Sequence, residues 1–169
     1  MNRRNTLLAL ASASCSSPAA AGVMDWYNGV KLGAKLPHYD AEYLGLAPRS
    51  EFKLLLVDFW ATWCAPCRDE FPHLNALHAK FSDQGLLVLG LTKESRAVAE
   101  AFLPKVQINY ALGVGGQKPL QQALSIKALP YALLADRQRT IVWRGQASTL
   151  SIEEVARRLS AASQETPSK

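Results

Sequence analysis

The sequence predicts an α/β protein with a central mixed β-sheet and helices on both faces of that sheet. Short apolar runs at 54–57 and 86–91 are typical of buried strands, and each is followed by a helical pattern. Two later runs, 131–135 and 140–144, flank a four-residue polar turn and predict an antiparallel hairpin, and a last helix follows. The order strand, helix, strand, helix, hairpin, helix predicts this arrangement.

The helix after the first strand is indicated by Phe71, Leu74, Leu77 and Phe81, which recur at helical spacing. Pro72 lies inside this helix, where its missing N–H predicts a kink.

Two predicted helices end at residues that terminate helices. Gly85 ends the first helix, and Pro104 ends a second helix from about 95 to 103. Ser95 is placed to cap the second helix. We expect its Val98 and Phe102 to point into the core.

The second half of the chain continues with short elements. A strand is expected within 106–116, and 113–116 is expected to be a flexible glycine loop, because it lacks the lysine of a phosphate-binding loop. Residues 119–126 predict a short helix with proline in its first turn. Residues 151–154 form a capping-box pattern before the last helix.

The length and composition indicate one domain. The chain has 169 residues and is 49% apolar, which is enough for one core. We place the domain at 22–162, after a signal peptide or export segment at 1–21 and before a disordered polar tail at 163–169. The net charge is +5, and no run of five basic residues is present. A nucleic-acid partner is therefore not expected, and we expect a monomer.

The segment 1–21 has two basic residues, a short apolar stretch and three alanines, as a cleaved signal peptide has. The stretch is far shorter than the ~20 residues of a membrane-spanning helix. Lipidation at Cys15 is an alternative, although Ser12 stands where a lipobox has leucine. A twin-arginine signal is another, although Thr6 replaces its large apolar residue. The last alternative is an unprocessed, disordered N-terminus.

Cys64 and Cys67 lie where the first buried strand ends and a helix begins. The unpaired N–H groups and the dipole of a helix N-terminus stabilise a thiolate there, so a cysteine pKa falls below ~8.5. Both sulfurs can bond across one turn, because a disulfide needs Cα atoms roughly 4.4–6.8 Å apart. We expect Cys64 to be the exposed nucleophile of thiol–disulfide exchange and Cys67 to be the resolving thiol.

A cysteine pair at this spacing can also bind zinc or form a purely structural disulfide. His73 lies about 240° around the helix from Cys67, and His78 lies about 16 Å along it. Neither histidine can complete a tetrahedral zinc site with the cysteines, so we expect no metal.

The stretch from Phe59 to Cys67, Phe-Trp-Ala-Thr-Trp-Cys-Ala-Pro-Cys, resembles the TlpA/ResA type of thioredoxin-fold protein, with weaker agreement from about 33 to 161. The resemblance implies an exported thiol–disulfide oxidoreductase with the thioredoxin fold and without a cofactor. It also implies protein disulfides as substrates, a membrane dithiol donor of the DsbD/CcdA type, and a place in the periplasm or at the outer face of the cytoplasmic membrane, where lipoprotein anchoring is an alternative. Its activity would be reduction, for example in cytochrome c maturation or copper-site assembly.

The same resemblance implies a substrate-binding surface. Pro130 matches the cis-proline that faces the cysteines, and it leaves the backbone of Leu129 free to pair with an extended peptide. Ala128 and Tyr131 stand where the family usually has glycine and threonine, which changes the expected substrate preference. Trp63 is expected to shield the reactive sulfur and to contact the substrate.

Two carboxylic acids are expected to serve the resolving thiol as bases. Asp58 occupies the place of the buried acid of thioredoxin, and its apolar neighbours are expected to raise its pKa toward neutrality. Gly90 stands where the accompanying lysine would be. Glu70, one turn after Cys67, matches an active-site glutamate of ResA-type proteins. The alternative for Glu70 is an exposed acid that complements the helix dipole.

Other functions are less consistent with the residues. A disulfide oxidase or isomerase shares every motif and differs only in reduction potential. A copper-binding assembly module would need three residues between its cysteines and a distal histidine, whereas this chain has two residues between them and no histidine after His78. A peroxidase would need a threonine where Ala61 stands.

Overall fold

The computed structural model describes residues 29–45 and 47–164. The export segment 1–21, Cys15 and the last five residues lie outside the described part, so the predictions for them stay predictions. The last helix continues to Gln164, two residues beyond the domain boundary that the sequence suggested.

A six-stranded sheet with the order β1-β4-β3-β2-β5-β6 forms the centre of the molecule. Strands β2, β3 and β4 run parallel to one another, while β1 pairs antiparallel with β4, and β5 pairs antiparallel with β2 and β6. The predicted mixed sheet is therefore confirmed. The strands are β1 (Glu42–Leu44), β2 (Leu54–Phe59), β3 (Leu86–Thr92), β4 (Ala111–Val114), β5 (Tyr131–Asp136) and β6 (Ile141–Gly145).

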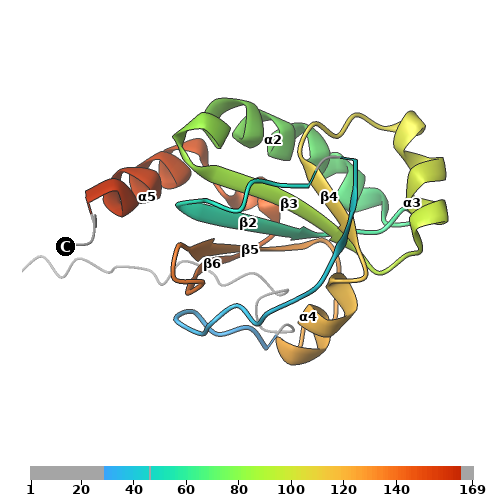
Figure 1. Cartoon of the computed structure of the whole chain (residues 1–169), viewed down its shortest axis with the longest axis horizontal. Coiled ribbons are helices and arrows are strands. Elements are labelled where there is room, and N and C mark those ends of the chain that lie inside the picture. Colours follow the sequence, from blue (N-terminus) through green and yellow to red (C-terminus); the bar gives the residue numbers. More distant parts are fainter. Residues whose placement is uncertain (1–28, 46, 165–169) are drawn as a thin grey trace, which may run out of the picture.

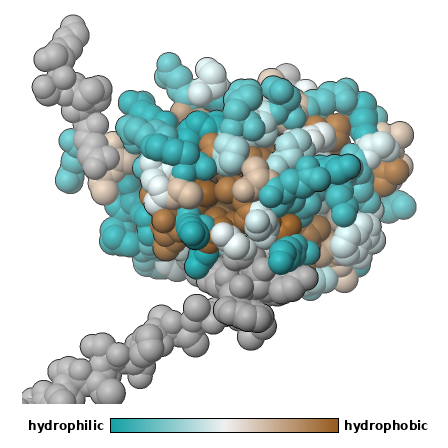
Figure 2. All heavy atoms as spheres, turned by 90° about the horizontal axis from the view of Figure 1, so that it is seen from below, coloured by the Kyte–Doolittle hydropathy of each residue, from teal (hydrophilic) through white to brown (hydrophobic). Residues whose placement is uncertain are grey.

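Helices cover both faces of the sheet (Figure 1), as predicted. Helices α2 and α5 pack on one face and α4 on the other. The helices are α2 (Ala65–Phe81), α3 (Arg96–Phe102), α4 (Gln117–Ala123) and α5 (Ile152–Gln164), and short 3₁₀ turns η1 (Ser82–Gln84), η2 (Leu103–Lys105) and η3 (Ala147–Thr149) follow α2, α3 and β6. Seen from the α4 side, hydrophilic residues surround a more apolar centre (Figure 2).

Alternating side chains of β2 supply two separate cores. Leu54 and Leu56 pack with α2 and α5, whereas Leu55, Val57 and Phe59 pack with α4. Because successive side chains of a strand point to opposite faces, Asp58 belongs to the face that α2 covers.

Two local predictions differ from the structure. Val98 is 46% exposed, and Ala99 is the buried residue of α3 instead, because a seven-residue helix presents only one narrow apolar face. Gly113 belongs to β4 and not to a loop, and a side chain there would press on Ala41 and Leu91. The hairpin turn has no glycine, and Arg139 adopts the left-handed conformation at φ 61°.

Candidate active site at the head of α2

The predicted cysteine pair forms a disulfide at the N-terminus of α2. Cys64 is the N-cap residue, and its Cα atom lies 5.3 Å from that of Cys67. The chain reaches this position directly from the end of β2 through residues 60–63, and the Cys64 N–H donates to the Ala61 carbonyl over 3.0 Å. Pro72 lies inside α2, as predicted.

The expectation that Cys64 is exposed is wrong for this disulfide-bonded state. Cys64 is 3% exposed and Cys67 is 1% exposed. The Cys64 sulfur is bonded inward to Cys67, and both cysteines belong to the core that contains Trp60 and Phe71. Trp63 is 66% exposed, and Ala65 and Pro66 are exposed as well, so these residues form the solvent-facing part of the motif.

Glu94 holds the loop before the cysteines. The Thr62 N–H and hydroxyl each donate to one carboxylate oxygen of Glu94 over 2.7 Å, and Arg68 donates to the Thr62 carbonyl over 3.1 Å. Sequence reasoning missed Glu94. The available signal was its position just after β3, since neighbouring parallel strands end at the same edge of a sheet.

Asp58 is buried beneath this region, and its exposed fraction is 1%. Neither carboxylate oxygen has a hydrogen-bond partner among the described residues. Burial raises the pKa of Asp58 well above 3.8, and the negative charge of Glu70 raises it further. The predicted direction of this pKa shift is confirmed.

No lysine accompanies Asp58, because its neighbour on β3 is Gly90. A Cβ atom at Gly90 would lie 2.6 Å from Leu112 Cδ2 and 3.1 Å from Trp60 Nε1. Neighbouring side chains thus fill the space that a longer residue would need.

Glu70 is buried as well, so the alternative of an exposed acid at the helix terminus is wrong. It is 4% exposed, and its Oε1 accepts hydrogen bonds from the Ser148 N–H over 3.2 Å and the Ser148 hydroxyl over 3.0 Å. Its Oε2 is buried without a partner among the described residues.

Tyr110 joins these acids, and no pattern in the sequence pointed to it. Its hydroxyl is buried without a described partner, and its pKa is raised well above 10.0 by burial and then by the charges of Asp58 and Glu70. Trp60 Nε1 is a second buried donor without a described partner. We call Asp58, Glu70, Tyr110 and Trp60 the buried polar cluster.

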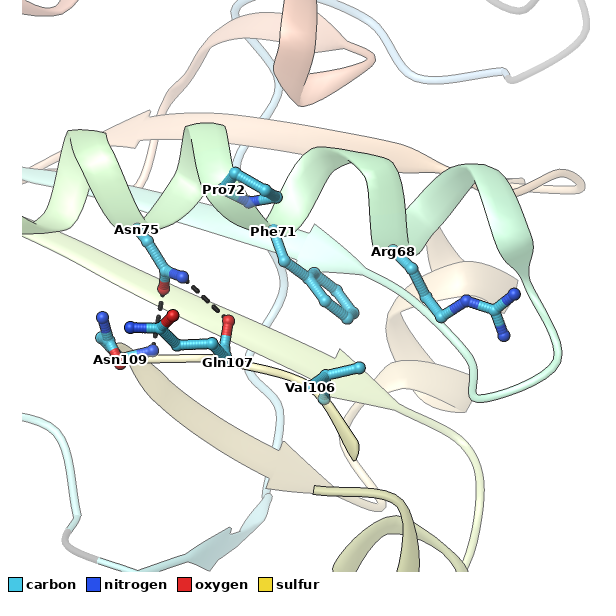
Figure 3. Close-up of a pocket in the computed structure, with 7 residues that line it drawn as sticks. All are labelled: Arg68, Phe71, Pro72, Asn75, Val106, Gln107 and Asn109. Atoms are coloured by element: carbon cyan, nitrogen blue, oxygen red, sulfur yellow. Dashed lines mark hydrogen bonds between the residues drawn. The ribbon is translucent and has the colours of Figure 1, made fainter. Parts of the chain in front are cut away.

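The segment before Tyr110 is fixed to α2 by one side chain (Figure 3). Asn75 Nδ2 donates to the Gln107 carbonyl, and the Asn109 N–H donates to Asn75 Oδ1, each over 2.8 Å. These residues line a shallow pocket of about 370 Å³ that also contains Phe71. Asn75 thereby helps to place Tyr110 against the α2 face of the sheet.

The Leu129–Pro130 bond is cis, as predicted. Tyr131 pairs with Phe59, so Pro130 lies beside the end of β2 that leads to the cysteines. No hydrogen bond to another described residue occupies the backbone of Leu129. The Tyr131 side chain is fully buried in the α4 core, so it is not available for the expected contact with a substrate.

The described residues contain no group of His, Cys, Asp or Glu side chains arranged to hold a metal ion. His73 instead hydrogen-bonds the Leu150 carbonyl over 2.9 Å. None of the described helices combines the length and the apolar composition that crossing a bilayer requires.

Fold and site together define a thioredoxin-fold protein with a disulfide at the head of its first long helix. The AhpC/TSA family model matches residues 34–144. The chain belongs to the AhpC/TSA family, and within it to the TlpA/ResA-like proteins. Its Ala61 is fully buried and has no hydroxyl to offer a peroxide.

Known proteins agree with this assignment. The chain is 25% identical over 91 residues to thiol-disulfide oxidoreductase ResA from Bacillus cereus, covering 53% of each chain. It is 22% identical over 110 residues to ResA from Bacillus thuringiensis, covering 63% of this chain and 64% of that one. The chain thus spans about half to two thirds of the length of these relatives.

A solved thiol:disulfide interchange protein from a Bacteroides species superposes with a TM-score of 0.60 at 22% identity, covering 81% of this chain and 91% of that one. This likeness supports the fold.

Proposed function

We propose that the protein is an exported thiol–disulfide oxidoreductase that reduces disulfides of client proteins. The observation that carries this proposal is the Cys64–Cys67 disulfide. It sits at a helix N-terminus, just after the strand that carries the buried Asp58 and that pairs with the strand following the cis-proline. Related proteins are named for the same chemistry.

The reaction begins with the reduced dithiol. The Cys64 thiolate attacks one sulfur of the client disulfide, that S–S bond breaks, and the first client sulfur leaves and takes up a proton. Client and protein are now joined through a mixed disulfide on Cys64. The Cys67 thiolate then attacks Cys64 Sγ and expels the second client sulfur. The client gains two electrons and two protons, and the protein ends with its own disulfide.

Asp58 has the properties that the second step requires. Cys67 must lose its proton inside the protein, and a carboxylate whose pKa is raised by burial accepts a proton more readily than an ordinary one does. Ser148 anchors Glu70, and the charge of Glu70 raises the pKa of Asp58, which strengthens Asp58 as a base. We assign Asp58 the role of proton acceptor and Glu70 a supporting role.

The client is proposed to bind across Trp63 and the Leu129–Pro130 bond. The unoccupied backbone of Leu129 can pair with an extended client segment, and the exposed indole of Trp63 adds an apolar contact.

Export through segment 1–21 remains part of the proposal, with lipid attachment at Cys15 as its alternative. The protein would act as a monomer, and a membrane dithiol donor of the DsbD/CcdA type would restore its reduced dithiol. Its clients would be proteins such as cytochromes c or copper-site proteins.

Equilibration of the purified protein with glutathione tests the direction of electron flow. A reduction potential near the ~−270 mV of thioredoxin supports a reductase, whereas a value near the ~−120 mV of a strong oxidant reverses the direction. An absence of exchange between Cys64 and glutathione would contradict the proposal in both directions.

A further inference from the structure

A basic groove lies directly beside the active-site motif. It has a volume of about 560 Å³ and begins at Trp63 and Leu129. Its walls come from the loop after β3, from α4, and from the segment before the cis-proline. The lining residues are Trp63, Lys93, Lys118, Gln121, Gln122, Ser125, Ile126, Lys127, Ala128 and Leu129. We call it the lysine groove.

The described residues that line the lysine groove include basic side chains and no acidic ones. The basic side chains are Lys93, Lys118 and Lys127, and all three are exposed. The nearest acid in sequence, Glu94, directs both of its carboxylate oxygens to Thr62. Lys93 after β3 and Lys118 at the start of α4 thus bring two positive charges to one concave surface, and Lys127 lines the same surface.

The position of the groove links this charge to the client. Leu129 offers its backbone to an extended client, and it also lines the groove. A polypeptide that places a cysteine at Cys64 and runs past Leu129 must continue over the lysines. At about 3.3 Å per residue in an extended chain, the client residues within a few positions of its cysteine come over the groove.

We infer that the lysine groove selects client segments that carry aspartate or glutamate close to the cysteine to be reduced. This inference rests on the proposed function and specifies its substrate class. Exposed lysines act mainly by raising the rate of productive encounter, and this effect is screened by salt. Trp63 and Leu129 supply contacts that every client shares, while the lysines discriminate among clients.

The test uses three synthetic peptides that contain the same internal disulfide and differ only in flanking residues, which are glutamate, glutamine or lysine. The second-order rate of reduction by the reduced protein is measured at about 0.01 M and about 1 M salt. Each rate is divided by the rate at which dithiothreitol reduces the same peptide, so that differences in intrinsic reactivity among the peptides cancel. The glutamate peptide should react about tenfold faster than the glutamine peptide at low salt, and the difference should vanish at high salt.

The matched variants exchange Lys93, Lys118 and Lys127 together for glutamate. We expect the order of the glutamate and lysine peptides to reverse. The control, Lys105→Glu, changes an exposed lysine of η2 outside the groove by the same charge and should keep the wild-type order. Because all four lysines are exposed, the variants should fold, and far-UV circular dichroism checks this.

The outcomes separate the two proposals. If no peptide is reduced, the proposed function fails. If all peptides are reduced at equal normalised rates, or if Lys105→Glu reverses the order as well, the groove has no selective role. The inference is also overturned if the groove variant discriminates like the wild type but loses binding to phosphatidylglycerol vesicles, since the lysines then serve a membrane surface.

Discussion

The two sides of the Cys64–Cys67 disulfide carry opposite charges in opposite surroundings. On the inner side, Asp58 and Glu70 are buried in the core. On the outer side, the lysines of the lysine groove are exposed to solvent. Water screens the outer charges but not the inner ones. The inner side can therefore control proton transfer, while the outer side acts on the approach of a client.

The largest effect should come from the disulfide that separates these sides. Cys64→Ser should reduce the rate of insulin-disulfide reduction to the uncatalysed background, because the attacking sulfur is gone. Cys67→Ser should instead accumulate a mixed disulfide with the client, since nothing displaces the captured sulfur. Non-reducing gels and mass spectrometry distinguish the two variants. Substantial turnover by either variant would contradict the assigned roles.

The second-largest effect is expected from Asp58→Asn, which should alter proton transfer and leave client binding unchanged. Asp58→Asn removes the proton acceptor, and we expect the release of client from the mixed disulfide to slow by roughly a hundredfold at neutral pH. Formation of the mixed disulfide should change little. Stopped-flow tryptophan fluorescence can follow both steps. An equal loss in both steps would show that Asp58 does not act on the resolving thiol alone.

Asp58→Asn should also be more stable to unfolding than the wild type at neutral pH. Because the folded protein raises the pKa of Asp58 well above 3.8, it holds that proton more tightly than the unfolded chain does. The free energy of unfolding therefore falls as the pH rises from 3.8 toward the folded-state pKa. Asp58→Asn should remove this part of the pH dependence and raise the melting temperature at pH 7. A lower melting temperature at pH 7 would show that Asp58 has polar partners outside the described residues.

Much of the inner side could be predicted from the sequence. Asp58 stands out because a charged residue in a buried strand is costly, and Cys64, Cys67 and Pro130 lie within local motifs. Tyr110 and Ser148 could not be predicted, because their positions near the acids depend on how distant segments pack. The exposure of Cys64 was also mispredicted, since a position in sequence does not show which side a disulfide turns toward.

The outer side was harder to predict for a similar reason. Lys93, Lys118 and Lys127 are isolated residues in the sequence, and no basic run marks them. They come together only because the loop after β3, the start of α4 and the segment before the cis-proline line the same groove. The buried face of α3 also could not be predicted from the sequence alone. Helical periodicity predicted that Val98 is buried, whereas in the packed structure Ala99 is the buried residue.

A smaller effect is expected from the second acid. Glu70→Gln removes the negative charge that helps to raise the pKa of Asp58, while the Gln carbonyl can still accept from Ser148. The pH midpoint of client release should shift downward by about one unit or less. Ser148→Ala is the control, because it keeps the charge and removes only one hydrogen bond. An upward shift in Glu70→Gln would mean that Glu70 does not act on Asp58 through its charge.

The smallest effect should come from Tyr110. Its hydroxyl is a donor buried together with ionisable acids, so it favours the ionised form of Asp58 over the neutral one. Tyr110→Phe should raise the pH midpoint of client release by a few tenths of a unit. It should leave the melting temperature unchanged or slightly higher, because a buried hydroxyl without a partner among the described residues costs stability.

Tyr43→Phe serves as the control for this change, because Tyr43 of β1 packs against the core on the α4 side. Its pH midpoint should equal that of the wild type. If Tyr110→Phe lowered the melting temperature and left the pH midpoint in place, the hydroxyl would act only in packing. Proton transfer on the inner side would then depend on the two carboxyl groups without help from Tyr110.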